Sequence, residues 1–192
     1  MRREVSNLTA EAYEQPTGPA LAGISDPAPM DLPLTENSTE KRREPSVDQI
    51  RTKIQGLFSR ARGESFIDGM DSVFSRGIRH FINRFGSKAL DEIAMLIINE
   101  IAEPEVAEEA LRWIGLLDEP ATRKYRLWLL CRALRSSSVR VRDGALLGIS
   151  FMDDPAAADE LRGAFDREAI SELRYEMGRV LEQLEAQRCP NT

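Results

Sequence analysis

The chain has 192 residues, a formal net charge of −6 and a single histidine, which leaves room for one domain of ordinary size and a tail. Its two cysteines are too few for a disulfide framework, and one histidine cannot supply a paired zinc site or an acid and base pair. No stretch has the length and apolarity of a secretory signal or a membrane span. We therefore expect a cytoplasmic protein that binds no metal or cofactor.

The first part of the chain differs in composition from the rest. Residues 1 to 48 hold six of the ten prolines and no Phe, Trp or Cys. Such a segment cannot bury enough apolar surface to offset the entropy of ordering the chain. We predict a disordered proline-rich tail over 1–45 and a helical domain over 46–188.

Helical periodicity begins at residue 46, where apolar residues recur at spacings of three and four. Ser46 followed by Gln49 predicts a capping box at the start of the first helix. Ser87 is expected to cap the third, whose apolar stripe extends to Ile101. The first three helices are predicted over 46–63, 70–85 and 87–101.

Three prolines punctuate the second half of the domain. Pro104, Pro120 and Pro155 each follow an acidic residue, and proline favours the first turn of a helix while an acid favours its positive end. Later helices are predicted over 104–117, 120–135, 138–152, 155–166 and 171–187. About eight helices with short connections indicate an all-α chain in which consecutive helices pack antiparallel, as a bundle or a solenoid.

An internal repeat distinguishes these two architectures. VAEEALRWIGLLDEPA at 106–121 aligns with VRDGALLGISFMDDPA at 141–156, with seven identities at an offset of 35. A weaker third copy at an offset of 34 pairs Arg140 with Arg174 and Gly144 with Gly178. A hairpin of this size cannot bury its apolar face alone, so the repeat predicts hairpins that stack and share a core.

The repeated positions have structural interpretations. The shared apolar residues are predicted to form the buried stripe of one helix. Gly144 and Gly148 fall in mid-helix, which favours close helix packing over a phosphate-binding loop. The acids before Pro120 and Pro155 are expected to be helix start signals rather than metal ligands.

Several of these motifs resemble a known family. The elements VRVRDGALLGI at 139–149 and DDPAA at 153–157, followed by ELRGAF and by SELR at 171–174, resemble HEAT repeats of the short bacterial type. The resemblance implies an α-solenoid of stacked antiparallel hairpins that acts as a protein-binding scaffold. Some members of this family modify chromophore proteins or bind DNA, and the family has no shared catalytic residues to transfer.

Charge alternates in blocks along the domain. The net charge is +5 over 50–88, −8 over 89–120, +7 over 121–142 and −6 over 143–192. Solvated faces that neutralise one another across neighbouring helices are the favoured interpretation. A dedicated basic patch in the block 121–142 is the alternative.

The basic block also supplies the candidate binding residues. Arg132 and Arg135 end one predicted helix while Arg140 and Arg142 begin the next, so we expect their side chains to cluster near one turn. An acidic protein segment or a phosphate backbone could dock there. Trp113 and Trp128 occupy apolar positions, where core packing is the first explanation and the edge of a groove the second. The predicted protein-binding residues are Arg132, Arg135, Arg140, Arg142, Arg174 and Trp113.

These features favour a non-catalytic adaptor or scaffold that presents a helical groove to an unidentified protein partner. The helices over 104–117, 138–152 and 171–187 are expected to line the concave side. One alternative is a nucleic-acid-binding protein that uses the block 121–142, and another is an accessory factor or lyase-like protein acting on a chromophore or prosthetic group. Ile50, Ile54 and Leu57 at one end leave both a monomer and a homodimer open.

Overall fold

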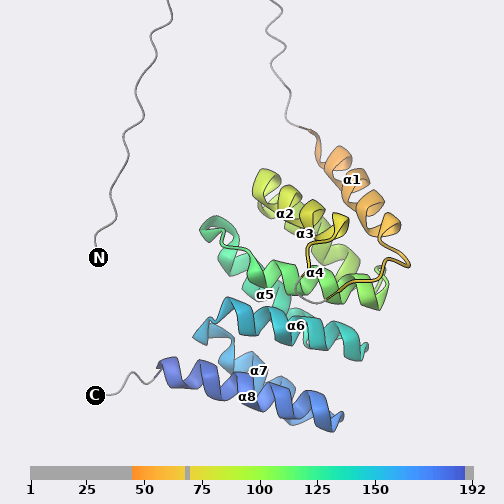
Figure 1. The fold of residues 1–192 in the computed structure, drawn as a ribbon. Coiled ribbons are helices and arrows are strands. Elements are labelled where there is room, and N and C mark those ends of the chain that lie inside the picture. Colours follow the sequence, from red (N-terminus) through yellow and green to blue (C-terminus); the bar gives the residue numbers. More distant parts are fainter. Residues whose placement is uncertain (1–44, 68–69, 189–192) are drawn as a thin grey trace, which may run out of the picture. The chain divides into compact units, whose positions relative to one another are not determined.

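A computed structural model describes residues 45–67 and 70–188. Within these ranges the chain forms eight α-helices and two short 3-10 turns, and no strand (Figure 1). The expected tail lies outside the described residues, apart from Pro45. The helices are α1 (Val47–Arg60), α2 (Val73–Phe85), α3 (Ser87–Ile98), α4 (Pro104–Leu116), α5 (Arg123–Ala133), α6 (Val139–Met152), α7 (Ala158–Arg167) and α8 (Ser171–Arg188).

The start of α1 agrees with the sequence prediction, whereas the start of α3 does not. The predicted capping box of α1 is confirmed, because Ser46 Oγ accepts from the Gln49 backbone N–H at 3.3 Å and Gln49 Oε1 accepts from the Ser46 N–H at 3.0 Å. The expectation for Ser87 is wrong. Gly86, at a φ of 55°, takes both the C-cap position of α2 and the N-cap position of α3. Glycine alone adopts this backbone without strain, so Ser87 becomes the first helical residue.

The acid and proline pairs start helices in two ways. Pro104 opens α4 directly, whereas Pro120 and Pro155 each open a 3-10 turn that precedes α5 or α7. The Glu119 carboxylate accepts from the backbone N–H of Ala121 at 3.3 Å, and Asp154 accepts from Ala156 at 3.0 Å. These acids therefore cap helix starts as predicted, while α5 and α7 begin three residues after their prolines.

Helices two apart in sequence pack side by side. Among the described helices, α2 contacts α4, α4 contacts α6, and α6 contacts α8. In the same way α1 contacts α3, and α3 contacts α5. Figure 1 shows α4, α6 and α8 next to one another in chain order. Helices adjacent in sequence also pack together, as α5 does with α6 and α7 with α8.

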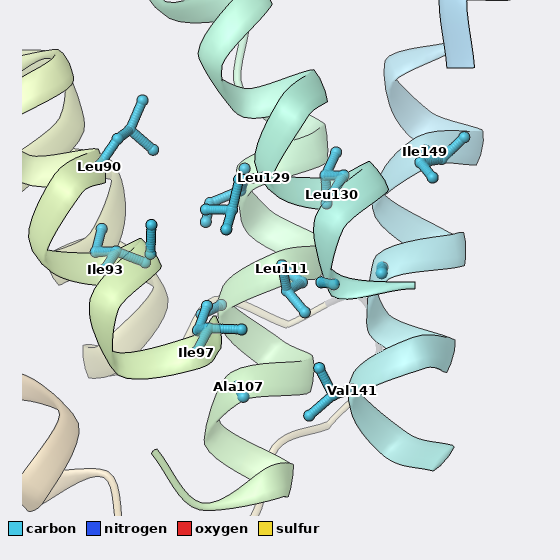
Figure 2. Packing of buried hydrophobic residues seen from close by; sticks show 14 of the residues in the cluster. Leu90, Ile93, Ile97, Ala107, Leu111, Leu129, Leu130, Val141 and Ile149 are labelled. Atoms are coloured by element: carbon cyan, nitrogen blue, oxygen red, sulfur yellow. The ribbon is translucent and has the colours of Figure 1, made fainter. Parts of the chain in front are cut away.

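The aligned repeat positions lie in this shared core, as predicted. The identical pairs Ala110 and Ala145, and Ile114 and Ile149, are all fully buried. Figure 2 shows how α3, α4, α5 and α6 contribute to one cluster through Leu90, Ile93, Ile97, Ala107, Leu111, Leu129, Leu130, Val141 and Ile149. Burying one such large aliphatic side chain stabilises the fold by about 1.5–3 kcal/mol.

Glycines set the separation of α4 and α6. A Cβ added at Gly144 would lie 2.6 Å from the Cα of Glu108, and one at Gly148 would lie 2.7 Å from the carbonyl oxygen of Leu111. No side chain fits at either position without moving the backbone of α4. The prediction that these glycines are packing positions is confirmed.

Two further expectations need correction. Helix α3 ends at Ile98 and the chain turns at Glu100, where φ is 55°, so Ile101 is 56% exposed rather than part of the buried stripe. The apolar stripe of α1 is covered within the chain, since Ile50 and Ile54 are at most 1% exposed, and the choice between a monomer and a homodimer stays a prediction.

The second correction concerns the repeat register of α8. Its buried residues Leu173, Met177 and Leu184 lie 32 positions after the buried Val141, Ala145 and Met152. The expected offset of 34 instead pairs the exposed Val139 with the buried Leu173. Burial therefore aligns Arg174 with Arg142, not with Arg140.

Candidate functional site

The fold uses most of the basic block 121–142 internally. Five of its seven cations are bound by carboxylates or carbonyl oxygens: Arg123 by Asp154, Arg126 by backbone oxygens, Arg135 by Glu160, Arg140 by Glu105 and Glu108, and Arg142 by Glu168. The other two, Lys124 and Arg132, form no ion pair with another residue that the structure describes. All of these bound cations except Arg126 pair with a carboxylate. The pairing of these four cations agrees with the favoured interpretation of the charge blocks, in which opposite charges neutralise one another across neighbouring helices.

Arg126 is a structural residue that the sequence did not single out. It is 1% exposed, and its guanidinium donates to the carbonyl oxygens of Ile114 at 2.8 Å and Glu119 at 3.1 Å. A third bond runs to Thr122 Oγ1 at 3.2 Å. Burial lowers the pKa of Arg126. This side chain ties the end of α4 to the start of α5 and is not accessible to a ligand.

Arg142 and Glu168 likewise have a structural role within the fold. The guanidinium donates two parallel bonds to the carboxylate, at 2.7 and 2.9 Å, and a further bond to the carbonyl oxygen of Ser136 at 3.0 Å. The Glu168 side chain is only 2% exposed, and the hydrogen bonds from Arg142 lower the pKa of its carboxyl group. Both groups line a hollow of about 560 Å³, but their bonding capacity is used within the chain.

Three other predicted residues lie elsewhere. Arg140 turns toward α4, 3.3 Å from Glu105 and 3.2 Å from Glu108. Arg174 on α8 is exposed and forms no ion pair with another described residue. Trp113 is half-buried, its indole N–H donates to Glu109 at 2.6 Å, and the guanidinium of Arg79 stacks 4.9 Å from its ring centre. The expected cluster of four arginines therefore forms only in part.

Arg132 and Arg135 do come together, at a hollow of about 370 Å³ beside α5. We call this hollow the α5 groove. Lys124, Trp128 and Arg132 lie four residues apart on α5 and so share one helix face. Helix α7 contributes Glu160, which is 2.8 Å from Arg135. The lining residues are Lys124, Leu127, Trp128, Cys131, Arg132, Arg135 and Glu160.

Trp128 is the most unusual side chain of the α5 groove. It is 50% exposed, although burial of so large a ring is a main source of stability in most folds. Its ring meets Tyr125 edge to face at 5.3 Å, and the Tyr125 hydroxyl donates to Asp91 of α3 at 2.7 Å. Burial and Asp91 raise the pKa of Tyr125 to about 12. Trp128 is therefore held in position by a neighbour that is itself anchored.

The floor of the α5 groove is uncharged at neutral pH. Burial raises the pKa of the Cys131 thiol to about 11, so the thiol stays protonated and is a weak nucleophile. Leu127 beside it is half-buried. Lys124 was missed at the sequence level, although its four-residue spacing to Trp128 and Arg132 was a usable signal.

Comparison of the chain with protein-family models, with curated proteins and with solved structures finds no match. None of the described helices combines the length and the apolarity needed to cross a lipid bilayer. Within the described ranges, no three His, Cys, Asp or Glu side chains gather in a way that could hold a metal ion.

Proposed function

We propose that the chain is a non-catalytic protein-binding adaptor or scaffold, built as a HEAT-like solenoid whose stacked hairpins form a rigid support. Two features support the architecture. Repeat-related residues such as Ile114 and Ile149 are buried alike, and helices two apart in sequence pack together. The α5 groove is the surface that receives the protein partner.

One observation carries this proposal: the half-exposed Trp128 lies between two cations, Lys124 and Arg132, that have no ion-pair partner among the described residues. Tryptophan and arginine are the usual anchors of protein interfaces. Covering the exposed half of the indole, roughly 100 Å², would contribute about 2–3 kcal/mol.

The same charge distribution disfavours nucleic acid. Affinity for a phosphate backbone grows with the number of cations that displace counterions. Five of the seven cations in the block 121–142 are already bound within the fold. A protein partner needs only a few acidic groups that match the two remaining cations, Lys124 and Arg132.

The alternative of an accessory factor for a prosthetic group has less support. The hollow of about 560 Å³ is lined by Arg142 and Glu168, and these two polar groups bond each other and the backbone. A ligand there would have to displace bonds that the fold already uses, at a cost of about 1–3 kcal/mol for each buried group left unpaired.

Affinity capture from the native host tests the proposal. Full-length wild-type protein, Trp128→Ala and the matched surface control Tyr175→Ala, whose ring is 67% exposed, would each be used as bait after nuclease treatment. We expect wild type and Tyr175→Ala to enrich the same protein and Trp128→Ala to lose it. Enrichment of no protein, or of a protein that is captured only when the nuclease is omitted, would overturn the proposed function.

A further inference from the structure

We infer that the α5 groove binds an extended acidic segment of a partner protein, in which one apolar side chain lies against Trp128 and is flanked at two-residue spacing by carboxylates. This inference rests on the proposed function and specifies the chemistry of the partner.

The charge of the groove selects an acidic occupant. Its lining contains three cations, Lys124, Arg132 and Arg135, and one acid, Glu160. Glu160 is already 2.8 Å from Arg135, with both side chains about half-exposed. The net positive charge therefore lies on Lys124 and Arg132, and carboxylates of the partner would complete the pairing that the fold leaves open.

The apolar part of the groove lies between these two cations. Trp128 is four residues from each of them along α5, and it borders a floor formed by Leu127 and Cys131. The hollow of about 370 Å³ has room for one large apolar side chain. A carboxylate at this central position would instead face an apolar floor and lose its hydration without a partner.

The spacing follows from helix and strand geometry. Eight residues separate Lys124 from Arg132, which is about 12 Å along the axis of α5. An extended chain advances about 3.3 Å per residue, so its carboxylates would be about four residues apart. Residues at alternate positions of an extended chain point to the same side. An acid, an apolar residue and a second acid at every other position would therefore all face the groove.

A peptide titration of the full-length protein tests this pattern. The probe is a labelled nine-residue peptide with two glutamates flanking one phenylalanine, each separated from it by one serine. Two control peptides replace both glutamates with glutamine or the phenylalanine with alanine. We expect each control peptide to bind at least 10-fold more weakly than the probe, by fluorescence anisotropy at low ionic strength.

Protein variants locate the site. Trp128→Ala should weaken binding of the probe about 10-fold or more, and Lys124→Ala and Arg132→Ala about 3-fold to 10-fold each. Lys53→Ala on α1 and Tyr175→Ala on α8 are matched controls, since both side chains are exposed and lie outside the groove lining. All substituted side chains are exposed, and circular dichroism would verify that each variant folds.

Charge reversal gives a result that a structural defect cannot produce. The variant Lys124→Glu, Arg132→Glu should lose the glutamate probe and gain a peptide with lysines in the same two positions. Equal binding of the glutamate and glutamine peptides, an unchanged affinity of Trp128→Ala, or stronger Trp128-dependent binding of a ten-residue oligothymidine would each overturn the inference. If host capture succeeds while the probe does not bind, the inference fails and the proposed function stands.

Discussion

Glu168 is a buried carboxylate whose negative charge is balanced by a single side chain. Its only side-chain partner among the described residues is Arg142, through two hydrogen bonds of 2.7 and 2.9 Å. Removing one member of a buried ion pair leaves a charge without compensation, which costs far more than losing an exposed pair.

We therefore expect Arg142→Ala to lower the free energy of unfolding by about 3 kcal/mol. Arg140→Ala is the matched control on the same helix, because its ion pairs with Glu105 and Glu108 are more exposed, and it should cost less than about 1 kcal/mol. Urea unfolding measures both. Equal losses in the two variants would show that the Arg142 pair is not the more important one.

The same pair predicts a pH dependence with a definite sign. The pKa of Glu168 is lower in the folded protein than its ordinary value, so the unfolded chain takes up its proton first as the pH falls. The stabilisation is fully present above the unfolded pKa of about 4.3 and is lost as the pH falls through the folded value. The stability difference between wild type and Glu168→Gln should therefore shrink from pH 7 to pH 3. A difference that stays constant or grows over this range would contradict the assignment.

At the scale of elements, the contact of α4 with α6 is set by residues that have no side chain. Gly148→Ala would place a Cβ 2.7 Å from the Leu111 carbonyl oxygen and 2.6 Å from a methyl carbon of Leu130. Because α4 backbone would have to move, we expect a loss of about 1–3 kcal/mol in unfolding free energy.

Gly163→Ala in α7 is the internal control for that prediction. Its added Cβ would meet only the flexible end of Arg167 at 3.3 Å, and alanine is the better helix former by about 1 kcal/mol. Thermal unfolding should show Gly148→Ala with a lower midpoint and Gly163→Ala with an unchanged or higher one. Two variants that behave alike would mean that the glycine contact does not limit the packing.

Local sequence signals predicted the helices and their caps because these depend on neighbouring residues. The box at Ser46 and Gln49 and the cap at Asp154 need only two or three residues of context. The register of α8 was not predictable in the same way. It depends on which residues meet α6 across the core, and identities of exposed residues such as Arg140 and Arg174 gave the wrong alignment.

The candidate site could be predicted only in part for the same reason. The sequence indicated that Arg132 and Arg135 lie close together, since both lie at the end of the predicted helix over 120–135. It could not indicate that Glu168, 26 residues after Arg142, would bind that arginine. Nor could it show that Trp128 would remain exposed at the groove, because this depends on where α7 lies.

At the scale of the whole molecule, the charge blocks of the sequence form ion pairs with one another in the fold. Few cations of the basic block 121–142 therefore remain unpaired. Acidic and basic blocks meet across helices, as in Arg51 with Glu92 and Arg123 with Asp154. Lys124 and Arg132 remain, on either side of Trp128. The proposed adaptor function rests on this groove.

Site-specific photo-crosslinking in the native host tests this account most directly. A benzophenone amino acid would replace Trp128 in one full-length protein and Tyr175 in another, since both rings are exposed on different helices. We predict a covalent adduct between position 128 and a protein segment that contains an apolar residue flanked by acids, and no such adduct from position 175. Adducts from position 175 alone, or crosslinks from position 128 only to nucleic acid, would contradict the account.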